Sequence, residues 1–244
     1  MMIELIGVGV PRSGGGWLLR ELSTIFESGT LVAVGASTTA ERLAVLDVVA
    51  GVRIPVEGRA WIDRQPLMPE TVRKLRRAIG DVDPAVGLRE HRSIGWNVMV
   101  PGSPRRALGA LLRLPRPGPR KAAAAALAAV RLAGRFADPA TVLSGADRVR
   151  VLLARALAHG QRHLLVRELD GAVPAYDVRP LLTLIASLSH RPGHVAIVTL
   201  ADPSLAIGLA DRILVLANGR EVRPREDQLL SSAALDRGLR VIRT

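Results

Sequence analysis

The chain has 244 residues, 48% of them hydrophobic, which suits one large α/β domain or a domain with a subdomain and excludes a disordered protein. It has no cysteine, which excludes a disulfide framework or a thiolate metal site and agrees with a reducing cytoplasm. Its 34 Lys and Arg against 22 Asp and Glu give a formal net charge of +12, which favours anionic neighbours such as the inner membrane leaflet, nucleic acid or an acidic partner.

The N-terminal part predicts strands of an antiparallel sheet. Residues 3–10 and 52–63 favour this assignment, with Glu57-Gly58 marking a turn. Residues 1–16 lack the basic start, compact apolar stretch and cleavage site of a signal peptide, so we do not expect export. No apolar run in the sequence reaches the ~18 residues that a membrane-spanning helix needs.

Short apolar runs separated by longer helical patterns predict a second, largely parallel sheet. Strands that are buried on both faces read as continuous apolar runs, and helices then cover both sides of the sheet. The runs lie at residues 31–34, 79–82, 164–166, 195–199 and 213–216.

The basic residues are spread along the chain, with denser groups at 73–77 and 105–121. Aromatic residues make up only 2% of the chain, so we see no stacking platform for single-stranded nucleic acid. We therefore favour an arginine-rich solvated face over a nucleic-acid groove.

The segment 101–136 predicts a helical insert. A proline-rich break at 114–119 separates two expected helices, and the alanine run at 122–129 is typical of a helix.

Two motifs carry the functional interpretation. Leu143-Ser144-Gly145-Ala146-Asp147 is followed by Ala-Arg-Ala-Leu at 154–157 and by an apolar run that ends in Arg167-Glu168. This order resembles the signature and Walker B segments of ATP-binding cassette (ABC) ATPases, in which LSGGQ precedes a buried strand ending in Asp-Glu. Arg167 occupies the position of the metal-binding Asp.

The resemblance covers nearly the whole chain. It implies an ABC ATPase-like P-loop NTPase fold, which is α/β with a mostly parallel core sheet, an N-terminal antiparallel β subdomain and a helical insert. The implied organisation is a single domain over 1–244, with a core at about 1–84 and 150–244 and a helical signature subdomain at about 85–149.

In this register, residues 36–44 replace the Walker A loop GxxGxGKST, whose glycines let backbone N–H groups close around phosphates. All three glycines are absent, Arg42 replaces the Lys, and Leu43 replaces the Mg²⁺-binding hydroxyl. The Glu41 carboxylate would repel a phosphate. A register that starts at Gly35 makes the loop no more competent. The positions that would contact a cofactor are Ser37, Thr38, Thr39 and Arg42.

Other positions also depart from the family pattern. Arg12 replaces the adenine-stacking aromatic, Pro84 the glutamine near the metal, and Ala201 the switch histidine. The D-loop corresponds to residues 171–174 without its final Asp. Because both Mg²⁺ ligands are replaced, we expect no metal site and no ATP hydrolysis by this chain alone, while residual ATP binding stays open.

Glu168 is the one catalytic group that the chain keeps, at the position that would polarise the attacking water. Without a metal or a Lys it is vestigial, and we favour an ion pair with Arg167 or another nearby Arg. The resemblance also implies that Ser144 and Gly145 contact the γ-phosphate held by a partner subunit. The alternative is that Ser144 only caps a helix ending near residue 158, and a carboxylate at Asp147 weighs against the phosphate role.

The histidine pair His159 and His163 has an i, i+4 spacing, but it straddles a helix end at Gly160 and a strand start. We therefore do not interpret this pair as a metal site.

The resulting hypothesis is a catalytically degenerate subunit of an ABC transporter. It would dimerise with an ATPase subunit, in a homo- or heterodimer, and couple to a transmembrane permease from the cytoplasm, peripheral on the inner face of the membrane. One alternative is a divergent nucleotide-binding or slow ATPase subunit that uses Arg12, Arg42 and Glu168. Another is a basic ABC-fold scaffold that binds nucleic acid or anionic lipid at the membrane surface.

Overall fold

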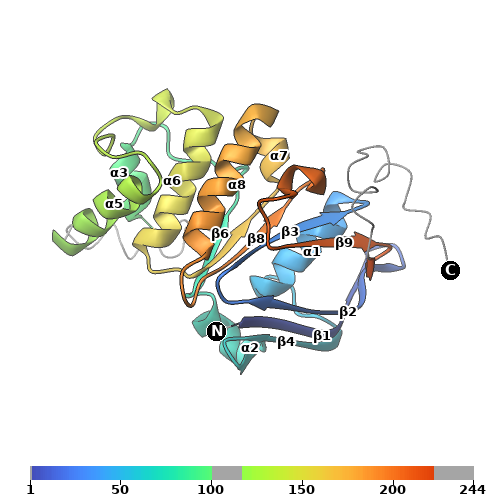
Figure 1. The fold of residues 1–244 in the computed structure, drawn as a ribbon. Coiled ribbons are helices and arrows are strands. Elements are labelled where there is room, and N and C mark those ends of the chain that lie inside the picture. Colours follow the sequence, from blue (N-terminus) through green and yellow to red (C-terminus); the bar gives the residue numbers. More distant parts are fainter. Residues whose placement is uncertain (1, 101–116, 223–244) are drawn as a thin grey trace.

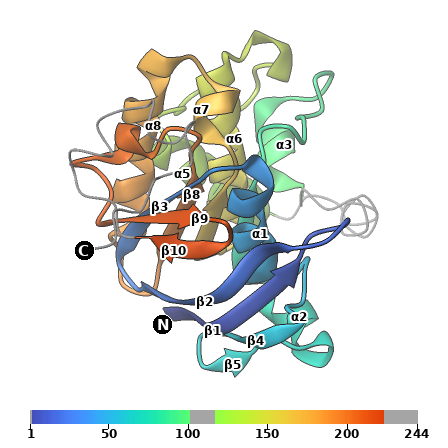
Figure 2. The same ribbon diagram turned by 90° about the vertical axis from the view of Figure 1, so that its right-hand side faces the viewer.

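The computed structural model describes residues 2–100 and 117–222, which form two β-sheets and the helices packed on them (Figure 1). The smaller sheet is antiparallel, with strand order β2-β1-β4-β5. Figure 2 shows this sheet as a separate layer beneath the strands β3, β8 and β9 of the larger sheet. Its strands are β1 (Met2–Pro11), β2 (Trp17–Glu27), β4 (Glu57–Ile62) and β5 (Gln65–Pro66).

The larger sheet has strand order β10-β9-β3-β8-β7-β6, and its strands are parallel except for β10, which pairs antiparallel with β9. The central strands β7 and β8 are buried along their whole length, which explains why they read as continuous apolar runs. The strands are β3 (Thr30–Ala36), β6 (Ile79–Val82), β7 (His163–Val166), β8 (Val195–Thr199), β9 (Arg212–Ala217) and β10 (Arg220–Val222).

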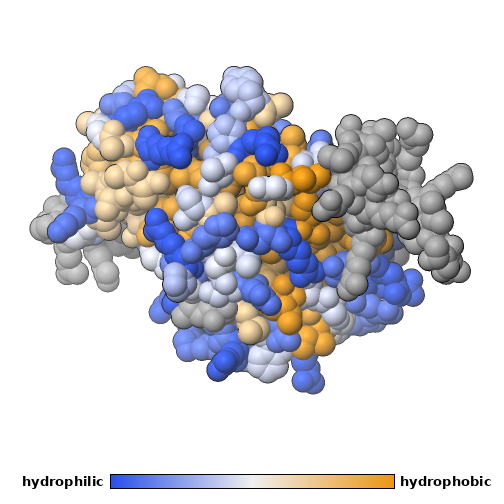
Figure 3. Space-filling model, viewed as in Figure 1, coloured by the Kyte–Doolittle hydropathy of each residue, from blue (hydrophilic) through white to orange (hydrophobic). Residues whose placement is uncertain are grey.

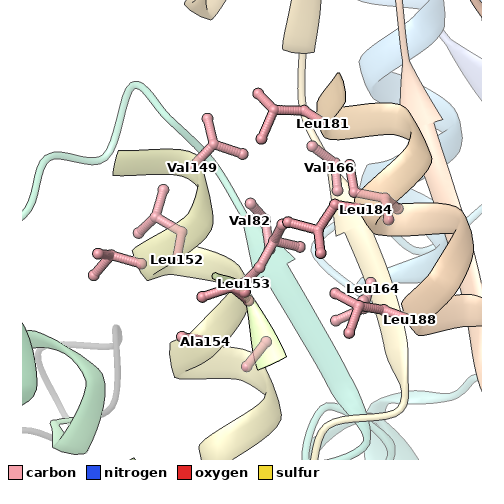
Figure 4. Close-up of a cluster of buried hydrophobic side chains, with 14 of the residues drawn as sticks. Val82, Val149, Leu152, Leu153, Ala154, Leu164, Val166, Leu181, Leu184 and Leu188 are labelled. Carbon is pink, nitrogen blue, oxygen red and sulfur yellow. The ribbon is translucent and has the colours of Figure 1, made fainter. Parts of the chain in front are cut away.

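Two apolar clusters hold these layers together. In the first, α1 (Thr39–Val49) packs with both sheets, and its buried Val45 and Leu46 join one core with strands of each. In the second, α6 (Gly145–Ala158) and α8 (Ala175–Ser189) cover the other face of the larger sheet, where Leu153 and Leu184 pack near Val82 (Figure 4). Burial of such side chains contributes roughly 1.5–3 kcal/mol each.

The remaining helices are short or lie away from the sheets. Helices α3 and α5 lie beside α6 at one end of the molecule (Figure 1). The division into a core and a helical subdomain stays a prediction, and α6 runs through its expected boundary at 149–150. These elements are α2 (Pro69–Leu75), α3 (Ile94–Met99), α5 (Pro117–Ala129), α7 (Leu169–Ala172), and the 3₁₀ helices η1 (Ala140–Val142) and η2 (Pro203–Ala206).

The five runs predicted as core strands all form strands of the larger sheet. The predicted turn at Glu57-Gly58 was wrong, because these residues begin β4 instead. Gly58 has φ +73°, and a Cβ there would lie 2.3 Å from the carbonyl oxygen of Gly7 on β1. The glycine therefore allows close approach of two strands, and residues 52–56 precede the strand.

The predicted break at 114–119 was partly wrong, since α5 already begins at Pro117. Proline is tolerated in the first turn of a helix, where its missing N–H has no intrahelical partner. The helix expected before this break lies outside the described residues.

Within the described ranges 2–100 and 117–222, no helix is long and apolar enough to cross a membrane. Figure 3 shows strongly hydrophilic residues scattered among apolar ones over one face of the molecule.

Candidate functional site

The loop between β3 and α1 is the centre of the candidate site. β3 ends at Ala36 and α1 begins at Thr39, so the loop lies at the carboxyl edge of the parallel sheet and at a helix N-terminus. Thr38 is the N-cap residue, and its Oγ1 accepts a hydrogen bond from the Glu41 backbone N–H at 3.3 Å. The capping side chain satisfies one of the free N–H groups with which every helix begins.

Arg42 turns back into this loop instead of facing outward. Its Nη1 donates to the carbonyl oxygen of Ala36 at 3.0 Å, and its Nη2 donates to Thr39 Oγ1 at 2.9 Å. Nε and Nη2 also donate to the two carboxylate oxygens of Glu168, at 3.0 and 2.6 Å. The Arg42 side chain is only 6% exposed, so its guanidinium is almost fully enclosed by these partners.

Glu168 follows β7 and has a left-handed backbone, with φ 42° and ψ 55°. Its backbone N–H donates to Thr199 Oγ1 at 2.7 Å, which fixes this conformation against the neighbouring strand β8. The expectation that Glu168 pairs with an arginine is met by Arg42 and not by its neighbour Arg167. A two-pronged guanidinium–carboxylate pair of this kind is among the stronger hydrogen-bonded contacts in proteins.

A second ion pair covers the first turn of α1. Glu41 is 2% exposed, and its Oε1 accepts from Arg12 Nη2 at 3.3 Å. Among the residues that the structure describes, its Oε2 is buried without a hydrogen-bond partner. Glu41 also belongs to the first turn of α1, where the helix dipole stabilises the negative charge of its carboxylate.

Arg167, at the expected position of a metal-binding carboxylate, is held by two carboxylates. Its Nε and Nη2 donate to Asp81 at 2.7 and 3.2 Å, and its Nη1 donates to Asp47 at 2.9 Å. Burial alone would lower the pKa of Arg167, but the hydrogen bonds to Asp81 and Asp47 outweigh it and raise the pKa. The guanidinium thus stays charged and joins β7 to β6 and α1.

Sequence reasoning did not identify Asp170, which organises the loop after β8. Its two carboxylate oxygens accept from the backbone N–H groups of Ala201 and Asp202, at 3.0 and 2.8 Å. Asp170 lies two residues beyond Glu168, and this short spacing from the end of β7 was the only available signal. These two hydrogen bonds hold the backbone at Ala201, the position at which the family pattern has a histidine.

The signature segment forms the N-terminus of α6. Ser144 is the N-cap residue, and its Oγ accepts from the Asp147 backbone N–H at 3.1 Å. The Asp147 carboxylate accepts from Arg135 at 3.0 Å and from Arg150 at 2.7 Å. These two guanidinium groups offset the negative charge that weighed against a phosphate role for this segment.

The loop before α1 does not fit a nucleotide phosphate. The guanidinium of Arg42 is already bonded to Glu168, and Glu41 buries a carboxylate in the first helical turn, where a phosphate would need free N–H groups and positive charge. Leu43 offers no oxygen ligand at the position of the Mg²⁺-binding hydroxyl. In the described part of the chain, no three His, Cys, Asp or Glu side chains group as metal ligands.

The two histidines of the i, i+4 pair, His159 and His163, lie in different environments. His163 is fully buried at the start of β7, where its Nε2 lies 3.1 Å from Asp63 Oδ2. His159 is the C-cap residue of α6. The helix end and strand start that separate the pair in the sequence are present as predicted.

No family model matches the chain. It is 33% identical over 240 residues to the aliphatic sulfonates import ATP-binding protein SsuB of Cupriavidus pinatubonensis, covering 96% of this chain and 74% of that protein. It is 28% identical over 207 residues to the sulfate/thiosulfate import ATP-binding protein CysA of Brucella melitensis, covering 83% of this chain but only 55% of that protein. The dimeric structure of MJ0796, a bacterial ABC transporter cassette, superposes with a TM-score of 0.72 and 25% identity, covering 91% of this chain and 97% of that one.

Proposed function

The chain belongs to the family of ABC transporter ATP-binding subunits, and we propose that it is a catalytically degenerate member that works through an ATPase partner. The observation that carries the proposal is the pair of Arg42 with Glu168. The residue at the position of the phosphate-binding Lys and the residue at the position of the water-polarising Glu are bonded to each other. Neither group is then available to a nucleotide.

The signature segment supports a contribution to a partner's site. Ser144 uses its oxygen as the helix cap, which leaves its hydroxyl hydrogen free to donate to a phosphate oxygen. The helix N-terminus adds positive potential, and Arg135 and Arg150 hold the nearby Asp147 carboxylate. In the proposed dimer, Ser144 and Gly145 complete the nucleotide site of a partner subunit that has an intact Walker A loop.

The segment after β6 supports coupling to a transmembrane permease. Val86 is 52% exposed there, and the guanidinium groups of Arg89 and Arg92 lie 5.7 and 5.3 Å from the ring centroid of Trp96. The buried Asn97 anchors this segment, because its side chain bonds both the N–H and the carbonyl of Arg89. We propose that this surface meets the permease on the cytoplasmic, inner face of the membrane.

Both relatives are named as import proteins, which favours an import system over an exporter for this chain. The two alternative functions have less support in the structure. Arg12 and Arg42, which a divergent nucleotide site would need, are paired with Glu41 and Glu168. The basic residues, which a nucleic-acid or lipid scaffold would need, include many that are paired with carboxylates, such as Arg135, Arg148 and Arg212.

The test is titration of the purified chain with ATP, with and without Mg²⁺, by calorimetry, together with an assay of ATP hydrolysis. We expect neither binding up to millimolar ATP nor hydrolysis. When the chain is co-purified with its ATPase subunit, we expect ATP turnover that requires Ser144. Micromolar ATP binding by the chain alone would favour the divergent nucleotide-binding alternative and refute a degenerate site.

A further inference from the structure

The placement of Glu168 points to a specific role for this side chain. Its left-handed backbone costs about 1 kcal/mol or more for a residue other than glycine, so the surrounding structure must hold it there. The bond from its N–H to Thr199 does so, and it directs the carboxylate across the loop to Arg42. The chain thus maintains an unfavourable conformation at the residue that engages Arg42.

The contact has the geometry of anion recognition. A guanidinium presents two parallel N–H groups that fit two oxygens of a carboxylate or a phosphate equally well. Here Nε and Nη2 of Arg42 bind the two oxygens of Glu168, while Nη1 is anchored on the carbonyl of Ala36. The anchored guanidinium would keep its position if the carboxylate were removed.

The charges around the loop also indicate a site that favours an anion. Arg12 and Arg42 contribute two positive charges, and Glu41 and Glu168 contribute two negative charges, so the four cancel. Loss of the Glu168 charge leaves one net positive charge beside the N-terminus of α1. Such an environment attracts anions.

We propose that Glu168 is a built-in anionic ligand of Arg42, which masks a latent phosphate-binding site in the loop before α1. A phosphate group must displace a carboxylate that is attached to the same chain and already bonded to the guanidinium through both of its oxygens. Because the carboxylate is tethered, it is present at a high effective concentration and cannot be diluted away. This inference rests on the proposed function, because both require that the loop of the natural chain binds no nucleotide.

The experiment compares the natural chain with Glu168→Gln and Glu168→Gly. Glutamine keeps the size of the side chain and removes its charge, whereas glycine removes the side chain and accepts the left-handed backbone without strain. Each protein is titrated calorimetrically with inorganic phosphate and with pyrophosphate, in the absence of divalent metal. Circular dichroism and thermal unfolding monitor the fold of each protein.

We expect no binding by the natural chain up to millimolar anion and measurable binding by both variants, at least about tenfold tighter than any residual binding by the natural chain. The affinity should fall as salt is raised, and the double change Arg42→Ala with Glu168→Gly should abolish it. The control is Glu90→Gln, which removes the charge of an exposed glutamate bonded to Arg148, away from the loop. That variant should remain unable to bind.

Folded Glu168 variants that bind neither anion would overturn the masking role, as would equal binding by the natural chain. Unfolding of both variants would also overturn it, because Glu168 would then be a requirement of the fold. These outcomes differ from failure of the proposed function, which would appear as ATP binding or hydrolysis by the natural chain.

Discussion

Arg167 and Asp47 are joined by a hydrogen bond of 2.9 Å between the end of β7 and the last turns of α1. Asp81 on β6 binds the same guanidinium through both of its oxygens. The guanidinium therefore occupies the space between three elements that meet at the carboxyl edge of the sheet. A positive side chain between two carboxylates takes the place where the family pattern has a carboxylate beside a metal ion.

We predict that Arg167→Asp does not restore ATP hydrolysis and destabilises the fold. The change places a third carboxylate beside Asp47 and Asp81, and the three repel one another without the guanidinium that bridged the two aspartates. We expect a loss of about 2–4 kcal/mol in the free energy of unfolding, measured by urea denaturation.

The control for this change is Arg53→Asp, which makes the same charge reversal on a side chain that is 44% exposed and lies 4.0 Å from Asp47. Because exposed ion pairs contribute little, we expect a loss of under about 1 kcal/mol. Measurable ATP turnover by Arg167→Asp would contradict the account of a site that several substitutions have changed together.

The core strands could be predicted from the sequence because burial on both faces demands uninterrupted apolar runs. Strand β2 was missed, although Leu22, Thr24 and Phe26 alternate with exposed residues along it. Its mixed composition lacks the apolar run that identified the core strands. Gly58 was misread because close approach of another strand and a turn both require glycine, and only the fold distinguishes them.

The sequence indicated which loops carry the residues of the candidate site, but not which of their side chains bond to each other. The spacing placed Arg42, Arg167 and Glu168 at the right loops, since the family register fixes which strand each one follows. It could not show which arginine meets Glu168, because Arg42 lies 126 residues away in the sequence. Adjacent residues such as Arg167 and Glu168 direct their side chains to different neighbours, so the nearer arginine pairs with Asp81.

Two changes at Ser144 should separate its structural role from its role in a partner's site. Ser144→Ala removes the cap of α6 and should cost about 1 kcal/mol in unfolding free energy. Ser144→Asp keeps a capping oxygen but adds a negative charge where a phosphate would approach. We expect both variants to lower ATP turnover in the purified complex, whereas only the alanine variant should lose stability. Normal turnover with Ser144→Asp would leave Ser144 as a cap alone.

His163 should make the fold less stable in acid. Burial lowers its pKa, and the hydrogen bond to Asp63 only partly opposes this, with Arg162 and His194 adding like-charge repulsion. The folded chain therefore binds the proton less readily than the unfolded chain, whose histidine titrates near 6.5. Stability is then lost as the pH falls below 6.5.

The measurement is urea denaturation of the natural chain and of His163→Gln between pH 8 and pH 5. Glutamine can still bond Asp63 but cannot titrate, so this variant should lose less stability in acid than the natural chain. His91→Gln, at an exposed histidine, is the control for the loss of an imidazole as such and should follow the natural chain. Parallel acid profiles for the natural chain and His163→Gln would contradict the assignment.

Gly95→Ala should disturb the packing that holds the proposed permease surface in place. A Cβ at Gly95, in α3, would lie 2.4 Å from the ring of Phe136, whose backbone carbonyl also accepts the Gly95 N–H at 2.8 Å. Because the added methyl must push either the ring or the helix aside, we expect a loss of about 1–3 kcal/mol in unfolding free energy. Gly87→Ala is the matched control, since a Cβ there meets no atom of the described residues within 4 Å. If the two variants unfold at the same urea concentration, the packing of α3 against Phe136 does not hold the proposed permease surface in place.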